Sequence, residues 1–544
     1  MLRALRASVL VALATAAAAC GGGTAAPGPP ASAPPVAAKP SAAAPVAAAP
    51  PLPYPATRRV DAVEQRFGLT IRDPYRWLED GKSPEVQAWV AAQDKLARDY
   101  LATLPGRDAI AERIAAIAYR ESVSPPVKRG GRAFFSRKDA KAEKRKVYWR
   151  QGEKGEERVL LDPDAMEGGK HVGLGFWAPS YDGKSVAYVA HPDNADAGFV
   201  RVKDVASGRE SAVDVIGGAK YARPLWTPKG DGFYYVGLPT DPSIAPDQLP
   251  GHSEVKFHRL GTPAAADEVA FPKTGNPETE LAAKLSRDGR WLLVSVLRGA
   301  SVIELHCRDL RRPGAPWVAL VKGHDGVMDA VAWKDQIYLR TSEGAPNGRV
   351  FRVDPARPAR AAWREIVPED KGAALEDAAV LGGRLVLTYA RDAKSEFELR
   401  SLDGARQGKG PIALPGVGSS YGVFGEPDDE TAYYPFSSFT TPGAIYELAL
   451  KTGESKLWYA SRAPVDPAAY ETEQAFYPSK DGTKVSLFVV RRKGAPKDGS
   501  TPFLLTGYGG FGFNMTPGFG EAQYVWLELG GGVALPNLRG GAEY

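Results

Sequence analysis

A hairpin unit recurs between about residues 125 and 460, and this repeat constrains the fold more than any other feature of the sequence. Each unit pairs two apolar strands across a polar turn, often Asp-Gly, as in FWAPSYDGKSVAYVA (176–190) and AKLSRDGRWLLVSVL (283–297). Such turns are strong hairpin signals. The spacing of about 45–55 residues is typical of four-stranded propeller blades. With the unit at 132–150, the pattern predicts a seven-bladed β-propeller over residues 121–460, in preference to an open sandwich of hairpins.

Different patterns flank the repeat. Residues 83–104 carry apolar side chains at helical spacing, with Ser83 as a capping residue and Pro84 at the first position, and a second helix is expected over 108–119. From about residue 461 the chain has continuous apolar runs that end at glycines, which is typical of buried strands in an α/β sheet. A chain of 544 residues exceeds the roughly 250–300 residues of one core, so several domains are expected.

The first 20 residues, MLRALRASVLVALATAAAAC, have the arginines, apolar stretch and small residues of a secretory signal peptide. The AAAC ending resembles a bacterial lipoprotein signal, which would make Cys20 the lipidated first residue of the mature protein. Ala17 replaces the usual leucine, so cleavage after an A-x-A site remains the alternative. Residues 21–53 are almost wholly Gly, Ala, Pro and Ser and are expected to form a disordered linker. We therefore expect an exported bacterial protein, either periplasmic or anchored to a membrane by lipid.

Charge and motifs exclude several classes of function. The net charge of +5 is spread along the chain, and the basic run KDAKAEKRK (138–146) contains acids, so nucleic acid is not an expected partner. No phosphate-binding, zinc-helix or calcium-loop motif occurs, and no cofactor or metal is expected. The two cysteines are Cys20 and Cys307. If Cys20 is lipidated, Cys307 has no partner and is expected to be a small buried apolar residue.

The stretch LLTGYGGFGFNMTP (504–517) places a cluster of glycines at the end of an apolar run. Glycine weakens a strand interior, so a cluster at its exit indicates a sharp turn or a close approach to another group. A functional site and a plain strand-to-loop junction are both compatible with this pattern.

Four segments together resemble the prolyl oligopeptidase family of serine peptidases: DPYRWLED (73–80), FYPSKDGTKVSLFVV (476–490), GYGGF (507–511) and NLRGGAEY (537–544). The resemblance spans about residues 55–544. It implies a seven-bladed β-propeller inserted into an α/β-hydrolase domain, with 54–120 as the N-terminal helical segment of that domain and 461–544 as its incomplete continuation. It also implies an endopeptidase that cleaves short peptides after proline, with the propeller restricting access. We expect the protein to be monomeric, although the sequence itself does not give the oligomeric state.

The same resemblance implies roles for individual residues. Tyr508 matches the tyrosine that stabilises the oxyanion, and Phe511 matches an aromatic residue of the proline pocket, although packing in the core is an alternative for Phe511. The Ser, Asp and His of the triad follow in that order in this fold. Since no histidine follows His324, the triad is expected beyond Tyr544, and all six histidines (171, 191, 252, 258, 306 and 324) are expected to be ordinary surface or loop residues.

The motif GSSYG (418–422) matches the nucleophile pattern G-x-S-x-G, but no helical pattern follows Ser420, as a nucleophile elbow requires. Ser420 is therefore not expected to be catalytic. Without a triad, the chain is expected to be an inactive fragment of a peptidase. Two alternatives remain: a propeller that acts only as a binding module, and a related oligopeptidase that cleaves after basic residues.

Overall fold

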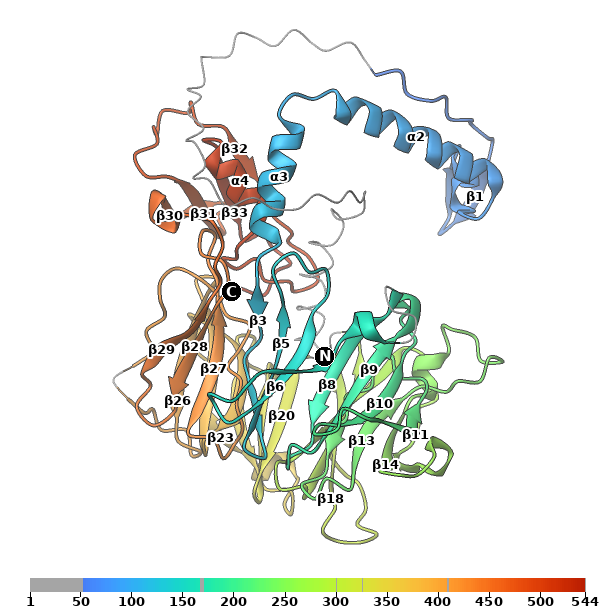
Figure 1. Cartoon of the computed structure of the whole chain (residues 1–544), viewed down its shortest axis with the longest axis vertical. Coiled ribbons are helices and arrows are strands. Elements are labelled where there is room, and N and C mark those ends of the chain that lie inside the picture. Colours follow the sequence, from blue (N-terminus) through green and yellow to red (C-terminus); the bar gives the residue numbers. More distant parts are fainter. Residues whose placement is uncertain (1–51, 167–170, 300, 325, 409, 544) are drawn as a thin grey trace. The chain divides into compact units, whose positions relative to one another are not determined.

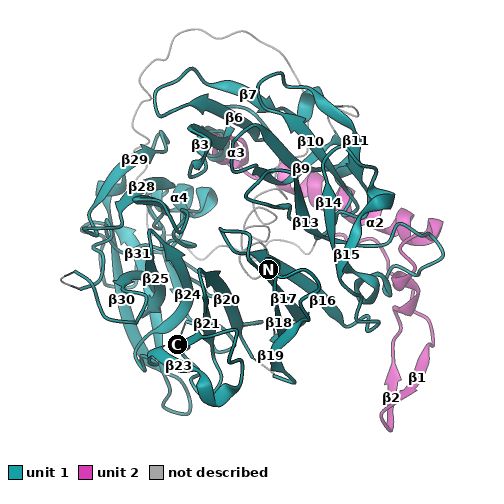
Figure 2. Ribbon diagram, turned by 90° about the horizontal axis from the view of Figure 1, so that it is seen from below, with its two compact units in different colours: residues 1–6, 114–544 teal, residues 7–113 magenta. Residues whose placement is uncertain are grey.

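The computed structural model describes residues 52–543 except 167–170, 300, 325 and 409. The predicted signal peptide, with Cys20, and nearly all of the predicted linker lie outside these residues. The described chain forms two compact units, whose described parts are residues 52–113 and 114–543 (Figure 2).

The smaller unit begins with the two-stranded sheet of β1 (Val63–Arg66) and β2 (Leu69–Arg72) and continues with α2 (Pro84–Ala102). The hydroxyl of Ser83 accepts a hydrogen bond from the backbone N–H of Val86 at 3.2 Å, which satisfies one of the free donors at the start of α2. The helix α3 (Arg107–Ala118) then leads into the larger unit. Both helices predicted from the sequence are confirmed.

Seven antiparallel sheets follow along the described chain, in the order expected for propeller blades (Figure 1). The first contains β3 (Ser122–Val123), β4 (Val127–Arg129), β5 (Arg132–Lys138), β6 (Lys146–Gln151) and β7 (Arg158–Leu161). The second contains β8 (Gly173–Pro179), β9 (Ser185–His191), β10 (Phe199–Asp204) and β11 (Glu210–Ile216). The third contains β12 (Leu225–Trp226), β13 (Gly232–Gly237), β14 (Glu254–Arg259) and β15 (Glu268–Phe271).

The fourth sheet contains β16 (Thr279–Leu285), β17 (Trp291–Arg298), β18 (Ser301–Asp309) and β19 (Val318–Lys322). The fifth contains β20 (Met328–Trp333), β21 (Gln336–Thr341), β22 (Arg349–Val353) and β23 (Arg364–Val367). The sixth contains β24 (Ala374–Leu381), β25 (Arg384–Arg391) and β26 (Lys394–Arg400), and the seventh contains β27 (Thr431–Phe436), β28 (Ala444–Ala449) and β29 (Ser455–Ala460).

The recurring aromatic residues join neighbouring blades. The indole N–H of Trp226, on the third blade, donates to the carbonyl of Ala178 on the second at 2.9 Å. The indole of Trp291, on the fourth blade, donates to Lys334 at 2.8 Å, in the turn between β20 and β21 of the fifth. Each of these two indoles is buried and satisfies its own donor, so at these two interfaces one residue provides both packing and orientation.

The first and seventh blades meet through side chains. In the described chain no strand of the first blade pairs with a strand of the seventh. Instead, Arg129 forms an ion pair with Glu426, Lys128 donates to the hydroxyl of Thr431 at 3.4 Å, and the hydroxyl of Tyr459 donates to the carbonyl of Glu121 at 3.1 Å. The ring is therefore joined at this interface by polar side-chain contacts.

After the propeller, the chain forms a second kind of sheet with strand order β30-β31-β33-β32, accompanied by the short helix α4 (Glu521–Glu528). Its strands are β30 (Tyr470–Pro478), β31 (Lys484–Arg492), β32 (Phe503–Leu505) and β33 (Gly532–Pro536), and β32 runs parallel to β33. The fully buried Ile117 of α3 packs in one core with Phe488 and Tyr524. Chain segments on either side of the propeller thus share one α/β core, as the inserted architecture requires.

In the described part of the chain, no helix is both long enough and apolar enough to cross a membrane.

Candidate functional site

The glycine-rich segment leaves β32 and packs against the loop that follows β33. The backbone N–H of Gly512 donates to the carbonyl of Gly540 at 2.8 Å. Gly509 has φ +65°, and a Cβ there would lie 2.7 Å from the Cβ of Leu538. Gly540 has φ +92°, and a Cβ there would overlap the carbonyl oxygen of Gly509. The two loops approach so closely that larger residues would both clash and be strained, which is the physical reason for the glycines.

Tyr508 lies at the tip of this junction. Its side chain is 56% exposed, and its ring packs edge-on against Phe513 with ring centroids 5.5 Å apart. Within the described chain, no hydrogen bond to the Tyr508 hydroxyl is found. The phenol is therefore held by its ring while its O–H is available to a ligand.

Phe511 has φ +53° and is 95% exposed. The alternative that it packs in the core is therefore wrong, because the left-handed backbone of the tight turn directs the ring into solvent. A role in a proline pocket stays a prediction.

A buried polar network lies beneath the two loops. Asn537, 5% exposed, accepts a hydrogen bond from the hydroxyl of Ser486 at 2.5 Å and donates through Nδ2 to the carbonyl of Met515 at 2.8 Å. Nδ2 also donates to the carboxylate of Glu543 at 3.1 Å, which in turn accepts from the backbone N–H of Met515 at 2.7 Å. The network ties β31, the Tyr508 loop and the chain after β33 together.

Sequence reasoning did not assign these polar residues. The sequence feature that could have indicated them is the stretch NLRGGAEY, in which Asn537 and Glu543 follow a buried strand. A polar residue at a strand exit often binds a neighbouring loop.

The propeller also supports the loop. The side-chain amide of Asn514 donates to Glu376 of β24, and the hydroxyl of Ser419 donates to the carbonyl of Pro517 at 2.5 Å. Tyr508 is thus on a segment held on one side by the α/β sheet and on the other by the sixth and seventh blades.

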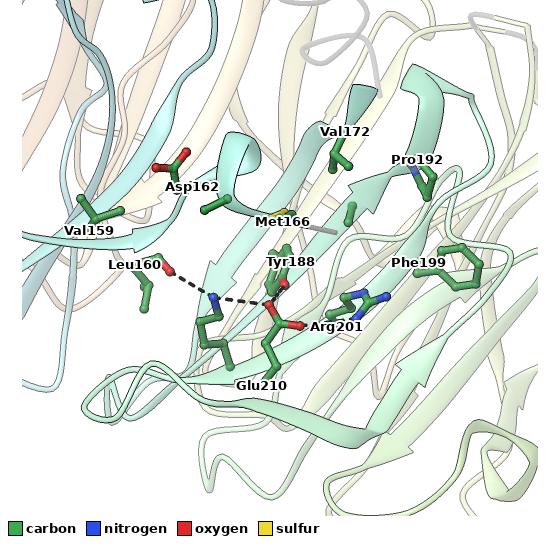
Figure 3. A pocket seen from close by; sticks show the side chains of 13 residues that line it. Val159, Leu160, Asp162, Met166, Val172, Tyr188, Pro192, Phe199, Arg201 and Glu210 are labelled. Carbon is green, nitrogen blue, oxygen red and sulfur yellow. Dashed lines mark hydrogen bonds and ion pairs between the residues drawn. The ribbon is translucent and has the colours of Figure 1, made fainter. Parts of the chain in front are cut away.

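A pocket of about 330 Å³ lies elsewhere, between the first and second blades (Figure 3). Its charged residues are paired: Glu210 binds Lys203 at 3.3 Å and Arg201 at 3.4 Å, and it accepts from the hydroxyl of Tyr188. Burial and the neighbouring Glu210 raise the pKa of Tyr188, so this phenol stays protonated. The polar groups are already satisfied, and none of the residues lining the pocket belongs to the Tyr508 loop.

Ser420 lies in the chain between β26 and β27, where its hydroxyl donates to the carbonyl of Gly422 at 3.1 Å. Its backbone N–H donates to the hydroxyl of Ser395 at 2.9 Å. The next element in the described chain is the strand β27, not a helix. Ser420 therefore lacks the strand–turn–helix setting of a nucleophile elbow.

The prediction that every histidine is an ordinary surface or loop residue is wrong for His258. This side chain is 0% exposed on β14, and its ring nitrogens lie 2.9 Å from the carboxylate of Asp214 and 2.7 Å from that of Asp267. Asp214 belongs to the second blade, so the histidine joins two blades. His306 is also nearly buried, on β18. Strand alternation turned both rings inward, where His258 is a structural residue without solvent access.

Cys307 on β18 is a free thiol at 0% exposure, as predicted. Burial raises its pKa to about 12, so it is protonated and unreactive near neutrality. Among the described residues, no group of three or more His, Cys, Asp or Glu side chains could hold a metal ion.

Comparison with known proteins gives a consistent result. The family model described as "Prolyl oligopeptidase, N-terminal beta-propeller domain" matches residues 54–461. The prolyl endopeptidase of Elizabethkingia miricola is 31% identical over 502 residues, covering 91% of this chain and 69% of that protein. A structure from a study of two prolyl endopeptidases has 49% identity and a TM-score of 0.85, covering 90% of this chain and 72% of the other. Prolyl oligopeptidase B of Galerina marginata has 25% identity and a TM-score of 0.82, covering 91% and 73%.

Proposed function

The chain belongs to the prolyl oligopeptidase family of serine peptidases, and from this we propose that the protein is an endopeptidase that cleaves short peptides after proline, with Tyr508 as an oxyanion donor. At family level, peptidase activity after proline rests on relatives that are named prolyl endopeptidases. The observation that carries the proposal for Tyr508 is its exposed phenol on a glycine-hinged loop whose base is fixed by buried hydrogen bonds.

The chemistry follows from what a phenol can do in such a position. When a nucleophile attacks the carbonyl after proline, the carbonyl oxygen gains negative charge as the carbon becomes tetrahedral. A positioned O–H stabilises this oxygen more than the neutral carbonyl, so it accelerates the reaction itself. Loss of one such donor typically lowers kcat by about 10²–10³, or about 3–4 kcal/mol. In this proposal Phe511 contributes an apolar wall against the proline ring.

The triad is not assigned to any residue of this chain. A chain without a nucleophile retains only the small acceleration that binding and oxyanion stabilisation supply, so we expect no measurable peptidase activity from residues 1–544 alone. Activity is expected from the complete reading frame of the gene, if this continues into a G-x-S-x-G elbow followed by an aspartate and a histidine.

The test uses the product of the complete reading frame with reporter peptides that carry proline or arginine before the cleaved bond. We expect cleavage of the proline reporter, and in Tyr508→Phe a kcat lower by about 10²–10³ with little change in KM. Tyr477→Phe, at a partly exposed tyrosine of β30, is the matched control and should retain full turnover. Unchanged turnover in Tyr508→Phe would refute the oxyanion role. A preference for arginine would refute the specificity, and a reading frame without a serine elbow would favour a binding module.

We also propose that the protein is exported and acts as a monomer, anchored by lipid at Cys20 or released after signal cleavage. The signal-like first 20 residues support export and the possible anchor. Fractionation of cells that express the wild type or Cys20→Ser tests it: membrane association that depends on Cys20 supports the anchor, and equal distribution of both proteins refutes it.

A further inference from the structure

One acidic side chain of the propeller reaches the loop that carries Tyr508. Glu376 is a partly buried residue near the start of β24, in the sixth blade. Its carboxylate accepts a hydrogen bond from the side-chain amide of Asn514, which lies in the same loop as Tyr508. A carboxylate is a stronger acceptor than a neutral oxygen, so this contact holds the loop firmly for a single bond.

Two contacts fix the orientation of the Asn514 amide. Its Nδ2 donates to Glu376, while its Oδ1 accepts from the backbone N–H of Ala542 at 3.1 Å. A reversed amide would turn its oxygen toward the carboxylate and its NH₂ group toward an N–H, so only one orientation satisfies both partners. Asn514 therefore connects three segments, which are the sixth blade, the Tyr508 loop and the chain after β33.

The path from Asn514 to Tyr508 is short. Phe513 directly precedes Asn514, and its ring packs edge-on against that of Tyr508 with centroids 5.5 Å apart. The backbone N–H of Phe513 donates to the carbonyl of Gly510 at 2.9 Å, which closes the turn between the two aromatic residues. A change of the backbone at Asn514 therefore moves the ring against which the phenol of Tyr508 packs.

The sixth blade makes another contact with the α/β sheet that does not involve this loop. The side-chain amide of Gln474, on β30, donates at 2.7 Å to the carbonyl of Asp392, in the turn between β25 and β26. Gln474 is partly buried, as Glu376 is. Loss of either contact weakens the attachment of the blade to the α/β sheet, but only loss of the contact of Glu376 frees Asn514.

We propose that Glu376 is a positioning residue for the oxyanion donor, and that it acts on Tyr508 through Asn514 and Phe513. A donor stabilises an oxyanion only when it lies within about 2.7–3.1 Å of that oxygen, and a misplacement of about 1 Å can lower a rate by about 10²-fold. A side chain of the propeller would thus contribute to the rate of peptide cleavage. This role of Glu376 rests on the proposed function, in which Tyr508 is the donor.

The test measures kcat and KM of the complete reading-frame product with the proline reporter. Glu376→Ala should lower kcat by about 10–100-fold with little change in KM, because the donor is displaced while peptide binding is retained. In a Tyr508→Phe background the same substitution should cause no further loss, because no donor is left to misplace. Gln474→Ala is the matched control and should retain the kcat of its background in both cases.

An exchange of the carboxylate and the amide separates positioning from general damage to the fold. Asn514→Asp places a second carboxylate against Glu376 and should lower kcat at least as much as Glu376→Ala. Glu376→Gln keeps an acceptor for the Asn514 amide and should lower kcat less. The double variant Glu376→Gln with Asn514→Asp restores a donor and an acceptor in reversed order, so it should recover most of the kcat that Asn514→Asp loses.

Several outcomes overturn the role of Glu376. They are an unchanged kcat in Glu376→Ala, an equal loss in Gln474→Ala, a loss that adds fully to that of Tyr508→Phe, and a double exchange variant that recovers nothing. If Tyr508→Phe loses activity while Glu376→Ala does not, only the positioning role falls. If Tyr508→Phe retains full turnover, the oxyanion role itself is refuted.

Hydrogen exchange on residues 1–544 tests the connection without any measurement of activity. The amide of Ala542 donates to Asn514, so it should exchange about tenfold faster in Glu376→Ala than in the wild type. It should be unchanged in Gln474→Ala. Wild-type exchange of Ala542 in Glu376→Ala would show that Glu376 does not hold Asn514, and the positioning role would fall whatever the complete reading frame contains.

Discussion

Asn537→Ala tests whether the buried network beneath the Tyr508 loop holds that loop in place. The substitution removes the acceptor of the Ser486 hydroxyl and one donor to the carbonyl of Met515. Ser486 is 0% exposed, so water does not replace the lost partner. Glu543 keeps its bond from the backbone N–H of Met515. The buried Ser486 hydroxyl and the partly buried carbonyl of Met515 therefore lose a partner, while Glu543 retains one.

The expected cost follows from these contacts. A buried polar group without a partner costs about 1–3 kcal/mol, and single substitutions rarely exceed about 4–5 kcal/mol. We therefore expect the free energy of local opening to fall by about 3–4 kcal/mol. Since each 1.4 kcal/mol is tenfold, the opened state becomes about 100–1000 times more populated.

Hydrogen exchange measured by mass spectrometry reports this opening directly. The amides of Gly512 and Met515, which donate to Gly540 and Glu543, should exchange about 100–1000 times faster in Asn537→Ala. Amides of the fourth blade should not change, and the exposed-turn variant Asn276→Ala should match the wild type throughout.

The double variant Ser486→Ala with Asn537→Ala tests whether the cost comes from the unsatisfied Ser486 hydroxyl, because removing both partners leaves fewer unsatisfied groups than removing one. It should exchange more slowly than Asn537→Ala alone. Wild-type exchange at Gly512 in Asn537→Ala, or purely additive effects in the double variant, would refute the proposed role of the network.

Two further predictions concern single groups. Because burial raises the pKa of Cys307 to about 12, its thiol should remain unmodified by a maleimide at pH 8 in the native protein. It should react once the chain is unfolded, and mass spectrometry would detect the added mass. Rapid labelling of the native protein would contradict the burial of this thiol. The bond from Arg539 lowers the pKa of Asp481 from 3.8 to about 2, so this pair favours the folded state above about pH 4 and loses its effect as the pH falls toward 2. An NMR titration of the Asp481 carboxyl should give a midpoint near 2 in the wild type and a higher midpoint in Arg539→Gln, still below 3.8 because the bonds from Thr483 remain; equal midpoints would exclude the pairing.

The parts of the fold that sequence predicted are those set by local chemistry. Ser83 and Pro84 mark the start of α2 because a cap acts on residues of its own first turn. The turn at Asp182 and Gly183 predicts its hairpin because Gly183 takes φ +69° at little cost. The resemblance to a family, rather than any periodicity, singled out Tyr508 and Phe511, and the sequence pattern indicated only that backbone segments approach each other there.

The features that sequence reasoning missed depend on contacts between distant residues. His258 and Asp214 are 44 residues apart, and Ser486 and Asn537 are 51 apart. Nothing local to either member of a pair reveals its partner, so the sequence alone predicts an ordinary histidine where the structure has a buried one.

The closure of the propeller and the position of the candidate site depend on the same α/β segment. The first blade follows directly from α3, and the seventh leads directly into β30, so both ends of the ring enter one core that contains Ile117 and Phe488. Within the described residues, the first and seventh blades meet through side-chain contacts, and no strand of one pairs with a strand of the other. The shared α/β core therefore holds the two ends of the propeller ring together. Asn514 and Ser419 join the Tyr508 loop to the sixth and seventh blades. If the shared core loosens and these blades move, the loop that carries the proposed oxyanion donor therefore loses its support as well.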